Sequence, residues 1–135
     1  MTDDRGTPTS ARPWALEHCP EAAGRARTIT QGLLNRWGVA GDVADSVLLT
    51  VSELVANAVQ HAQPPLCLGL GCDPAAGRVY VEVSDGGPAT EDGAAGLAED
   101  EHGRGLMIVD RVAAAHGDRR EAGQAVHWAD IAYAA

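Results

Sequence analysis

The sequence predicts an α/β sandwich (an α+β arrangement), in which helices cover one face of a single mixed or antiparallel sheet. Apolar residues recur at helical spacing through two long segments between residues 20 and 62. Strand-like alternation of apolar and polar residues follows over residues 66–72 and 78–85, and a last strand-like segment spans 124–133. Such elements bury their apolar sides when the helices pack on one face of one sheet.

Composition excludes several classes of protein. The chain has 135 residues, enough for one compact domain with a hydrophobic core, and its formal net charge is −9. This acidic balance argues against a nucleic-acid partner, and the absence of lysine from the sequence excludes a P-loop. No apolar run approaches the roughly 18 residues of a membrane span.

Localisation and domain limits follow from the same pattern. Residues 1–11 are polar and lack the apolar centre of a signal peptide, so we expect a flexible N-terminal arm there. We expect residues 12–135 to form a single domain. The odd number of cysteines (Cys19, Cys67 and Cys72) is typical of free thiols in a reducing compartment, which favours a cytoplasmic protein.

The first elements are a short strand or extended segment over Trp14–Cys19 and a helix that begins at Pro20-Glu21. Proline is favoured in the first turn of a helix, and the glutamate suits the positive end of the helix dipole. Apolar residues at helical spacing continue to Trp37, and we expect Gly38 to end the helix.

The second helix is predicted to start at Gly41-Asp42, with Asp42 as its N-cap, and to run to about Ala62, ahead of two prolines. Glu53, Asn57 and His61 are spaced i, i+4 and i+8, so they form one polar stripe along it. The stripe borders an apolar face, where burying a polar group costs a few kcal/mol unless it is paired or ligated. The stripe therefore holds candidate functional residues, and we expect His61 to have a structural role at the helix end.

An antiparallel hairpin is predicted next, from a strand over Leu66–Cys72, a turn over residues 73–77 and a strand over Arg78–Asp85. In the second strand Val79, Val81 and Val83 point one way, and the polar residues between them point the other way.

A long segment without periodicity follows the hairpin, and we expect it to form a lid over about residues 86–104. A disordered insertion is the alternative. A helix is predicted over Leu106–Ala115, closed by His116-Gly117, and Gln124–Tyr133 forms the last strand. We expect no functional role for His18, His116 and His127.

Several polar and glycine-bearing segments together predict a nucleotide site. Asp85–Gly87 lies where a strand ends, so the carboxylate can accept from a purine amine and the glycines allow close approach of a ring. Gly103–Leu106 lies where a helix begins, so its amides suit phosphate and Arg104 adds a charged donor. The Asn57 carbonyl oxygen suits Mg²⁺, and Glu53 can orient or deprotonate an attacking hydroxyl.

These segments resemble the motifs of the GHKL ATPases, which share the Bergerat ATP-binding fold. Glu53–Ala62 resembles the N box, Asp85–Gly87 the first glycine box, and Gly103–Leu106 the second. Together with the run Ala22–Gly38, they look like the stand-alone anti-sigma-factor serine/threonine kinases, the histidine-kinase-like ATP-binding regulators of actinobacteria. The resemblance covers about Trp14–Tyr133.

The resemblance implies a cytoplasmic, homodimeric regulator of transcription that binds ATP and Mg²⁺. It implies a kinase that sequesters a sigma factor and phosphorylates a serine or threonine of a STAS-domain anti-anti-sigma partner. By position the roles would be as follows: Glu53 as the general base, Asn57 as the Mg²⁺ ligand, Asp85 as the adenine contact, Gly87 as part of the adenine pocket, and Gly103, Arg104, Gly105 and Leu106 as the phosphate-binding box under the lid.

Two departures from the family pattern keep other functions open. Ala89 stands where the first glycine box often has a further glycine, and Ala125 stands where the last strand often has a threonine near the adenine-contacting aspartate. One lost hydrogen bond costs about 1 kcal/mol, which weakens nucleotide affinity without abolishing it. The alternatives are a nucleotide-binding partner switch with little or no kinase turnover, and a protein-binding module without nucleotide.

Overall fold

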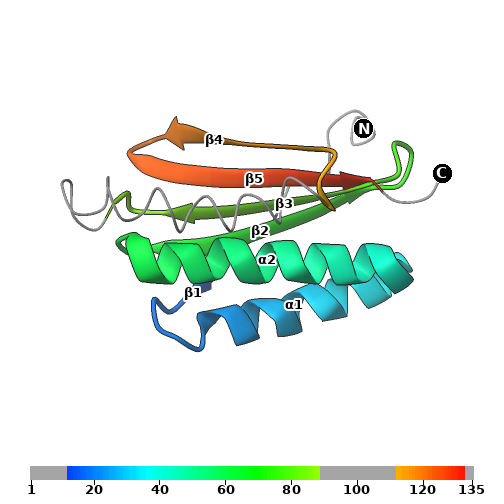
Figure 1. The fold of residues 1–135 in the computed structure, drawn as a ribbon, viewed down its shortest axis with the longest axis horizontal. Coiled ribbons are helices and arrows are strands. Elements are labelled where there is room, and N and C mark those ends of the chain that lie inside the picture. The colour runs from blue at the N-terminus through cyan, green and yellow to red at the C-terminus, as the bar shows by residue number, and fades with distance from the viewer. Residues whose placement is uncertain (1–11, 89–111, 133–135) are drawn as a thin grey trace.

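The computed structural model describes residues 12–88 and 112–132. Figure 1 shows two helices on one side of a twisted sheet. The strand order is β1-β2-β3-β5-β4, and every neighbouring pair of strands is antiparallel. The predicted sandwich is confirmed, and its sheet is antiparallel rather than mixed. The elements are β1 (Arg12–Leu16), α1 (Ala22–Trp37), α2 (Gly41–His61), β2 (Leu66–Asp73), β3 (Arg78–Asp85), β4 (Ala115–Glu121) and β5 (Gln124–Ala132).

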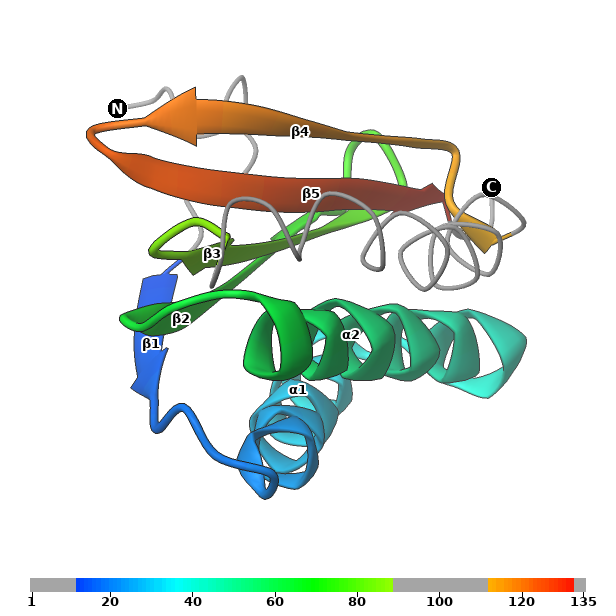
Figure 2. The ribbon, with the colours of Figure 1, turned by 60° about the vertical axis from the view of Figure 1, so that its left-hand side comes forward.

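The two helices lie side by side against the sheet, as Figure 2 shows. The first ends as expected, because Gly38 takes the left-handed conformation (φ 72°) and its N–H bonds back to carbonyls of the last turn. The second has Ala40 as its N-cap, two residues before the expected Asp42, and no side-chain cap. The prediction of Asp42 as N-cap is therefore wrong, because the helix begins at Gly41 and leaves Asp42 inside its first turn. Among the described residues, no helix is long and apolar enough to cross a membrane.

The core lies between the helices and the β2–β3 hairpin, and the predicted hairpin is confirmed. Val79, Val81 and Val83 are fully buried on the face toward the helices, whereas the residues between them are only partly buried on the other face. The strands pair in register from Cys67 opposite Ser84 to Asp73 opposite Arg78. Because all three valines pack against the helix pair, this hairpin fixes the direction of its last residue, Asp85.

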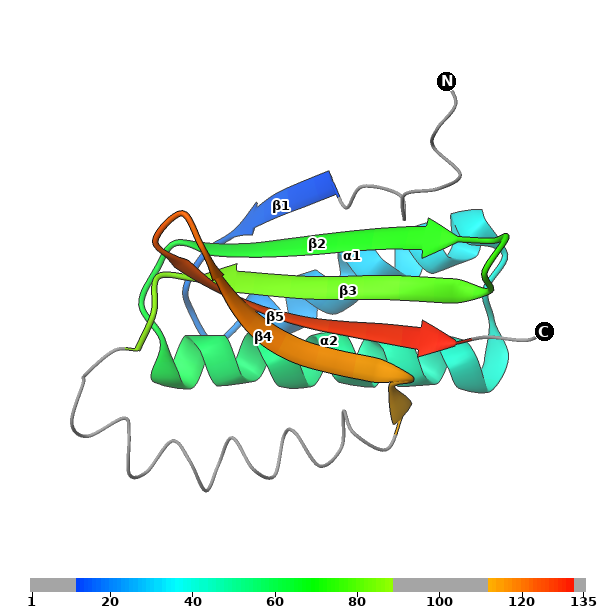
Figure 3. The same ribbon diagram turned by 90° about the horizontal axis from the view of Figure 1, so that it is seen from above.

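The β4 edge of the sheet differs from the prediction for this part of the chain. Ala115–Glu121 is an edge strand, so the expected helix does not close at His116-Gly117. Figure 3 shows β4 at one edge of the sheet and β1 at the other. An edge strand buries little, and β4 is largely exposed, so it carries charges instead of the alternation that marks a strand. Gly117 lets β4 approach closely, because a Cβ there would lie 3.0 Å from the ring of Trp128 on β5 and the ring would have to shift.

Three expectations fall outside the described part of the chain: the N-terminal arm over residues 1–11, most of the lid, and the first part of the helix predicted from Leu106. The last strand is confirmed over Gln124–Ala132, close to its predicted limits. The three cysteines form no disulfide within the described part of the chain.

Candidate functional site

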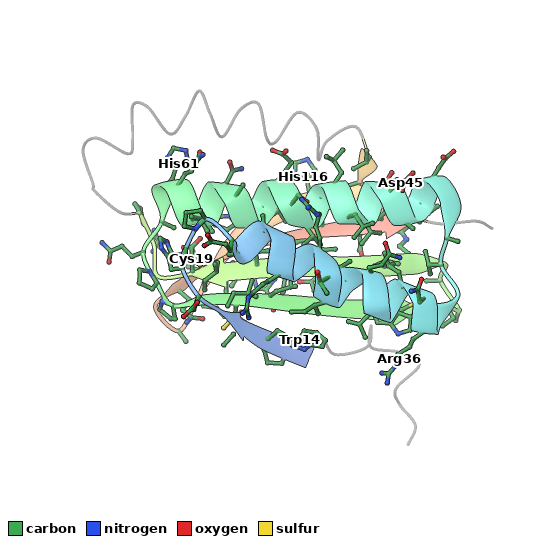
Figure 4. The ribbon with its side chains drawn as sticks, turned by 90° about the horizontal axis from the view of Figure 1, so that it is seen from below. Trp14, Cys19, Arg36, Asp45, His61 and His116 are labelled. Atoms are coloured by element: carbon green, nitrogen blue, oxygen red, sulfur yellow. The ribbon has the colours of Figure 1, made fainter. Side chains whose placement is uncertain are left out.

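The polar stripe of α2 lies next to the buried face of the helix. Glu53, Asn57 and His61 are each half-buried, and Leu54, with its apolar neighbours, is buried beside them. The helix contacts β3 and β5. Figure 4 shows His61 at the C-terminal end of α2 on the side away from α1. The stripe is therefore placed as the sequence predicts, along a face that borders the core.

Asp85 ends β3 as a buried carboxylate, with 1% of the residue exposed. Its Oδ1 accepts a hydrogen bond of 2.8 Å from the N–H of Gly87. Gly87 has φ 100°, a conformation that favours glycine, and a Cβ built there would meet no atom of the described residues within 4 Å. Among the described residues, the backbone at Gly87 therefore has open space on one side, next to the carboxylate of Asp85 that its N–H holds in place.

The structure gives a different reason for glycine at position 86 from the expected approach of a ligand ring. A Cβ at this position would lie 2.3 Å from the backbone oxygen of Pro64, much closer than atoms can approach. The N–H of Gly86 donates to the carbonyl of Gln63 (2.7 Å), and the N–H of Gln63 donates to the carbonyl of Gly87 (2.8 Å). We call this pair of hydrogen bonds the backbone strap. Gly86 thus serves contact within the chain rather than approach by a ring.

The backbone strap joins the chain just after α2 to the chain just after β3. An isolated β-bridge between Ala62 and Pro88 extends it. Figures 1 and 3 both show the C-terminal end of α2 and the end of β3 at the same end of the molecule. The helix that carries Asn57 and the strand that carries Asp85 are therefore held together by backbone contacts that tolerate few substitutions.

His18 holds the end of α2 from the other side. Its Nε2 lies 2.7 Å from the carbonyl oxygen of Ala62 and 3.2 Å from that of Ala58. The Ala58 oxygen also accepts from the N–H of Ala62. The last carbonyls of a helix lack partners within the helix, and the imidazole supplies one for Ala62. His18 therefore has a structural role beside the site, which the sequence did not indicate.

His127 on β5 is the residue of the site that sequence reasoning missed. Its Nε2 lies 3.0 Å from Oδ2 of Asp85, and its Nδ1 lies 2.6 Å from Oδ1 of Asp118 on β4. Both partners are carboxylates, so each ring nitrogen donates and the ring is an imidazolium. Burial disfavours this charge, but the hydrogen bonds to Asp118 and Asp85 outweigh it and raise the pKa of His127 from 6.5 to about 9.

A usable signal for this contact existed in the sequence. Ala122 and Gly123 form a two-residue hairpin turn, both with positive φ (51° and 81°), between β4 and β5. That turn sets Asp118 directly opposite His127. Recognising β4 as a strand would have exposed the Asp118–His127 pair. Contact with Asp85 would still have required the pairing of β3 with β5.

The structure places only part of the predicted site. It brings the α2 segment with Glu53 and Asn57 to the same region as the β3 end with Asp85 and Gly87. Residues 103–106, the predicted phosphate-binding segment with Gly103, Arg104, Gly105 and Leu106, lie outside the described residues.

Comparisons with known proteins identify a family and a fold for this chain. The model of the family described as the histidine kinase-like ATPase domain matches residues 16–128. A comparison with curated protein sequences gave no significant match. A chain in the crystal structure of the SiaB–SiaC complex from Pseudomonas aeruginosa is similar, with a TM-score of 0.61 and 11% sequence identity over 92% of this chain and 91% of that chain. At this identity the likeness shows a shared fold alone.

Proposed function

We propose that this chain, which belongs to the histidine kinase-like ATPase family, binds ATP and phosphorylates a serine or threonine of a regulatory partner protein. The observation that supports the proposal is the backbone strap, which ties the chain just after α2, the helix of Asn57, to the chain just after the buried carboxylate of Asp85. A nucleotide site needs an acceptor for the base, such as a carboxylate, close to a ligand for the phosphate-bound Mg²⁺, such as an amide oxygen.

The residues present fit a nucleotide. Asp85 is a buried acceptor suited to the 6-amino group of adenine, and Gly87 leaves open space beside it. Asn57 supplies a neutral oxygen, which suits Mg²⁺ held otherwise by phosphates and water. Gly103, Arg104, Gly105 and Leu106 complete the proposed site as the phosphate-binding segment, on the strength of their sequence.

Glu53 is the proposed general base. It lies one helical turn before Asn57 and is half-buried, so its carboxylate is accessible to a hydroxyl of an incoming protein. It accepts the proton of the serine or threonine hydroxyl while that oxygen bonds to the γ-phosphorus. The bond from the γ-phosphorus to the bridging oxygen breaks, and ADP leaves. A bound Mg²⁺ would neutralise the charge of the phosphates.

The proposed partners are a sigma factor and a STAS-domain anti-anti-sigma protein, and the active form is a homodimer. The motif resemblance over Trp14–Tyr133 supports this anti-sigma role. The similar chain from Pseudomonas aeruginosa also comes from a complex of two proteins. Partner exchange would follow phosphorylation, because a phosphate adds a charge of about −2 to the interface.

The test separates transfer from binding. The purified chain is incubated with Mg-ATP and with the STAS-domain proteins encoded beside it, and phosphate on the partner is measured by mass spectrometry. We expect Glu53→Gln to lower the transfer rate by about 10²–10⁴-fold and to leave the Kd for ATP within twofold. Asp85→Asn should instead weaken ATP binding by about tenfold or more.

Asp45→Asn is the matched control, because it removes one carboxylate from an exposed position of the same helix. It should change neither quantity. Tight ATP binding without phosphate on any partner would reject the kinase and leave the partner switch with little turnover. Failure of the wild-type chain to bind ATP would reject the nucleotide function as a whole.

A further inference from the structure

We propose that His127 is a positioning residue for base recognition: it fixes the Asp85 carboxylate as an acceptor for the 6-amino group of the purine, and Asp118 in turn fixes His127. This inference deepens the proposed function and rests on the proposed nucleotide site. Three hydrogen-bonded side chains on adjacent strands would then recognise the base: Asp85 on β3, His127 on β5 and Asp118 on β4.

The first step concerns the two oxygens of Asp85. The N–H of Gly87 donates to Oδ1 at 2.8 Å, and Nε2 of His127 donates to Oδ2 at 3.0 Å. Two donors from different elements fix both the place and the plane of the carboxylate. A carboxylate offers about four acceptor positions, so capacity for a ligand donor remains on each oxygen.

The second step concerns what fixes His127. It lies directly opposite Asp118 on β4 and directly opposite Val83 on β3, so it shares the helix-facing side of the sheet with Asp85. The 2.6 Å hydrogen bond from Nδ1 to Asp118 sets the orientation of the ring. Asp118 is 61% exposed, whereas the side chain of Asp85 is 2% exposed. The ring therefore ties a buried carboxylate to one at the surface.

The third step concerns why this position matters for specificity. Ala125 lies directly opposite Asp85 and has no donor in its side chain, so support from β5 comes from His127, two residues further along. The Asp85 carboxylate accepts from the N–H of Gly87 and from the His127 ring, so its remaining positions are presented to a ligand as acceptors. An acceptor-only group pairs with the 6-amino group of ATP and opposes the 6-oxo group of inosine triphosphate (ITP). His127 would therefore contribute to the preference for adenine.

The test measures the Kd of ATP and of ITP by calorimetry for the full chain and its variants. We expect His127→Ala to weaken ATP binding by about tenfold and to reduce the ratio of ITP to ATP dissociation constants by a similar factor. His127→Gln keeps a donor without the charge, so it should recover part of the affinity. Asp118→Asn should lose about two- to fivefold, because it acts through His127.

His116→Gln is the matched control, since it changes a histidine of the adjacent strand and should leave both dissociation constants unchanged. Circular dichroism checks that each variant folds, and Asp118→Asn, changed at an exposed position, decides the matter where His127→Ala does not fold. If wild type binds ATP and the variants at 127 and 118 keep its affinity and its preference over ITP, the inference is overturned. If wild type binds neither nucleotide, the proposed function itself has failed.

Discussion

Two regions of this molecule are stabilised in opposite ways. The apolar layer, where α1 and α2 pack on β2 and β3, rests on many interchangeable contacts among buried aliphatic side chains. The polar corner (Gln63, Asp85, Gly86, His127 and Asp118) rests on a few hydrogen bonds between particular atoms. A small change of volume in the first region is shared by many neighbours, whereas one atom misplaced in the second breaks a specific bond. The proposed recognition site lies in the less tolerant region.

The largest contrast should come from adding one methyl group to a glycine of the polar corner and to an exposed glycine of α1, one of the two helices of the apolar layer. Gly86→Ala places a Cβ 2.3 Å from the Pro64 oxygen and must separate the two sides of the backbone strap. We expect it to lower the free energy of unfolding by about 3 kcal/mol. Gly32→Ala, on an exposed position of α1 with nothing within 4 Å of the added atom, should raise it by about 0.5–1 kcal/mol.

Urea denaturation of both variants measures this contrast directly. The two substitutions are chemically identical, so the opposite signs would reflect their surroundings alone. Equal effects at the two positions would contradict the strap as a close backbone contact. Loss of ATP binding with Gly86→Ala, at a urea concentration where it remains folded, would connect the strap with the proposed site.

The next effect is a pH dependence specific to the polar corner. The pKa of His127 is raised from 6.5 to about 9 in the folded chain. A raised pKa means that the imidazolium stabilises the fold fully below pH 6.5 and that this stabilisation is lost as pH rises through about 9. At about 1.4 kcal/mol per pH unit, the loss for the rise from 6.5 to about 9 is about 3 kcal/mol.

The pH dependence is measured as the free energy of unfolding from pH 6 to 10, in wild type and in His127→Gln. The wild-type curve should fall across this range relative to the variant, while His116→Gln should follow wild type. Nuclear magnetic resonance of the His127 ring gives the pKa itself. A midpoint near 6.5 would show that the two carboxylates do not hold the charge.

The same division explains what the sequence could predict. Both helices and the β2–β3 hairpin were predicted because buried residues repeat with a fixed period, as Val79, Val81 and Val83 do. The edge strand β4 has no such period, since it is largely exposed and carries Gly117 and a run of charges. Its turn also begins with Ala122, which lacks the asparagine or aspartate typical of such turns.

The site divides in the same way. Asp85 was predicted, because its position at the end of a strand next to two glycines is visible locally. Its partner His127 lies 42 positions away in the sequence, on β5, which pairs with β3 although β4 lies between them in the sequence. The role of Gly86 was misread, because the approaching atom belongs to Pro64 on another segment. Contacts made by single atoms between distant segments leave no periodic trace in a sequence.

The smallest effect is expected where the two regions meet, at the C-terminal end of α2. His18 donates to the carbonyls of Ala58 and Ala62 and so ends a helix whose apolar face belongs to the core. His18→Ala removes this donor, but the Ala58 carbonyl keeps its hydrogen bond from the N–H of Ala62, so we expect a loss of only about 1 kcal/mol in the free energy of unfolding. Urea denaturation measures the loss, with Gly32→Ala serving as the reference for a change at an exposed position of α1. Amide hydrogen exchange should quicken at Ala62 and Gln63 and stay unchanged in the middle of α1. If amide exchange instead quickened equally in α1 and at the end of α2, the effect of His18 would not be local, and the helix end would belong to the apolar layer.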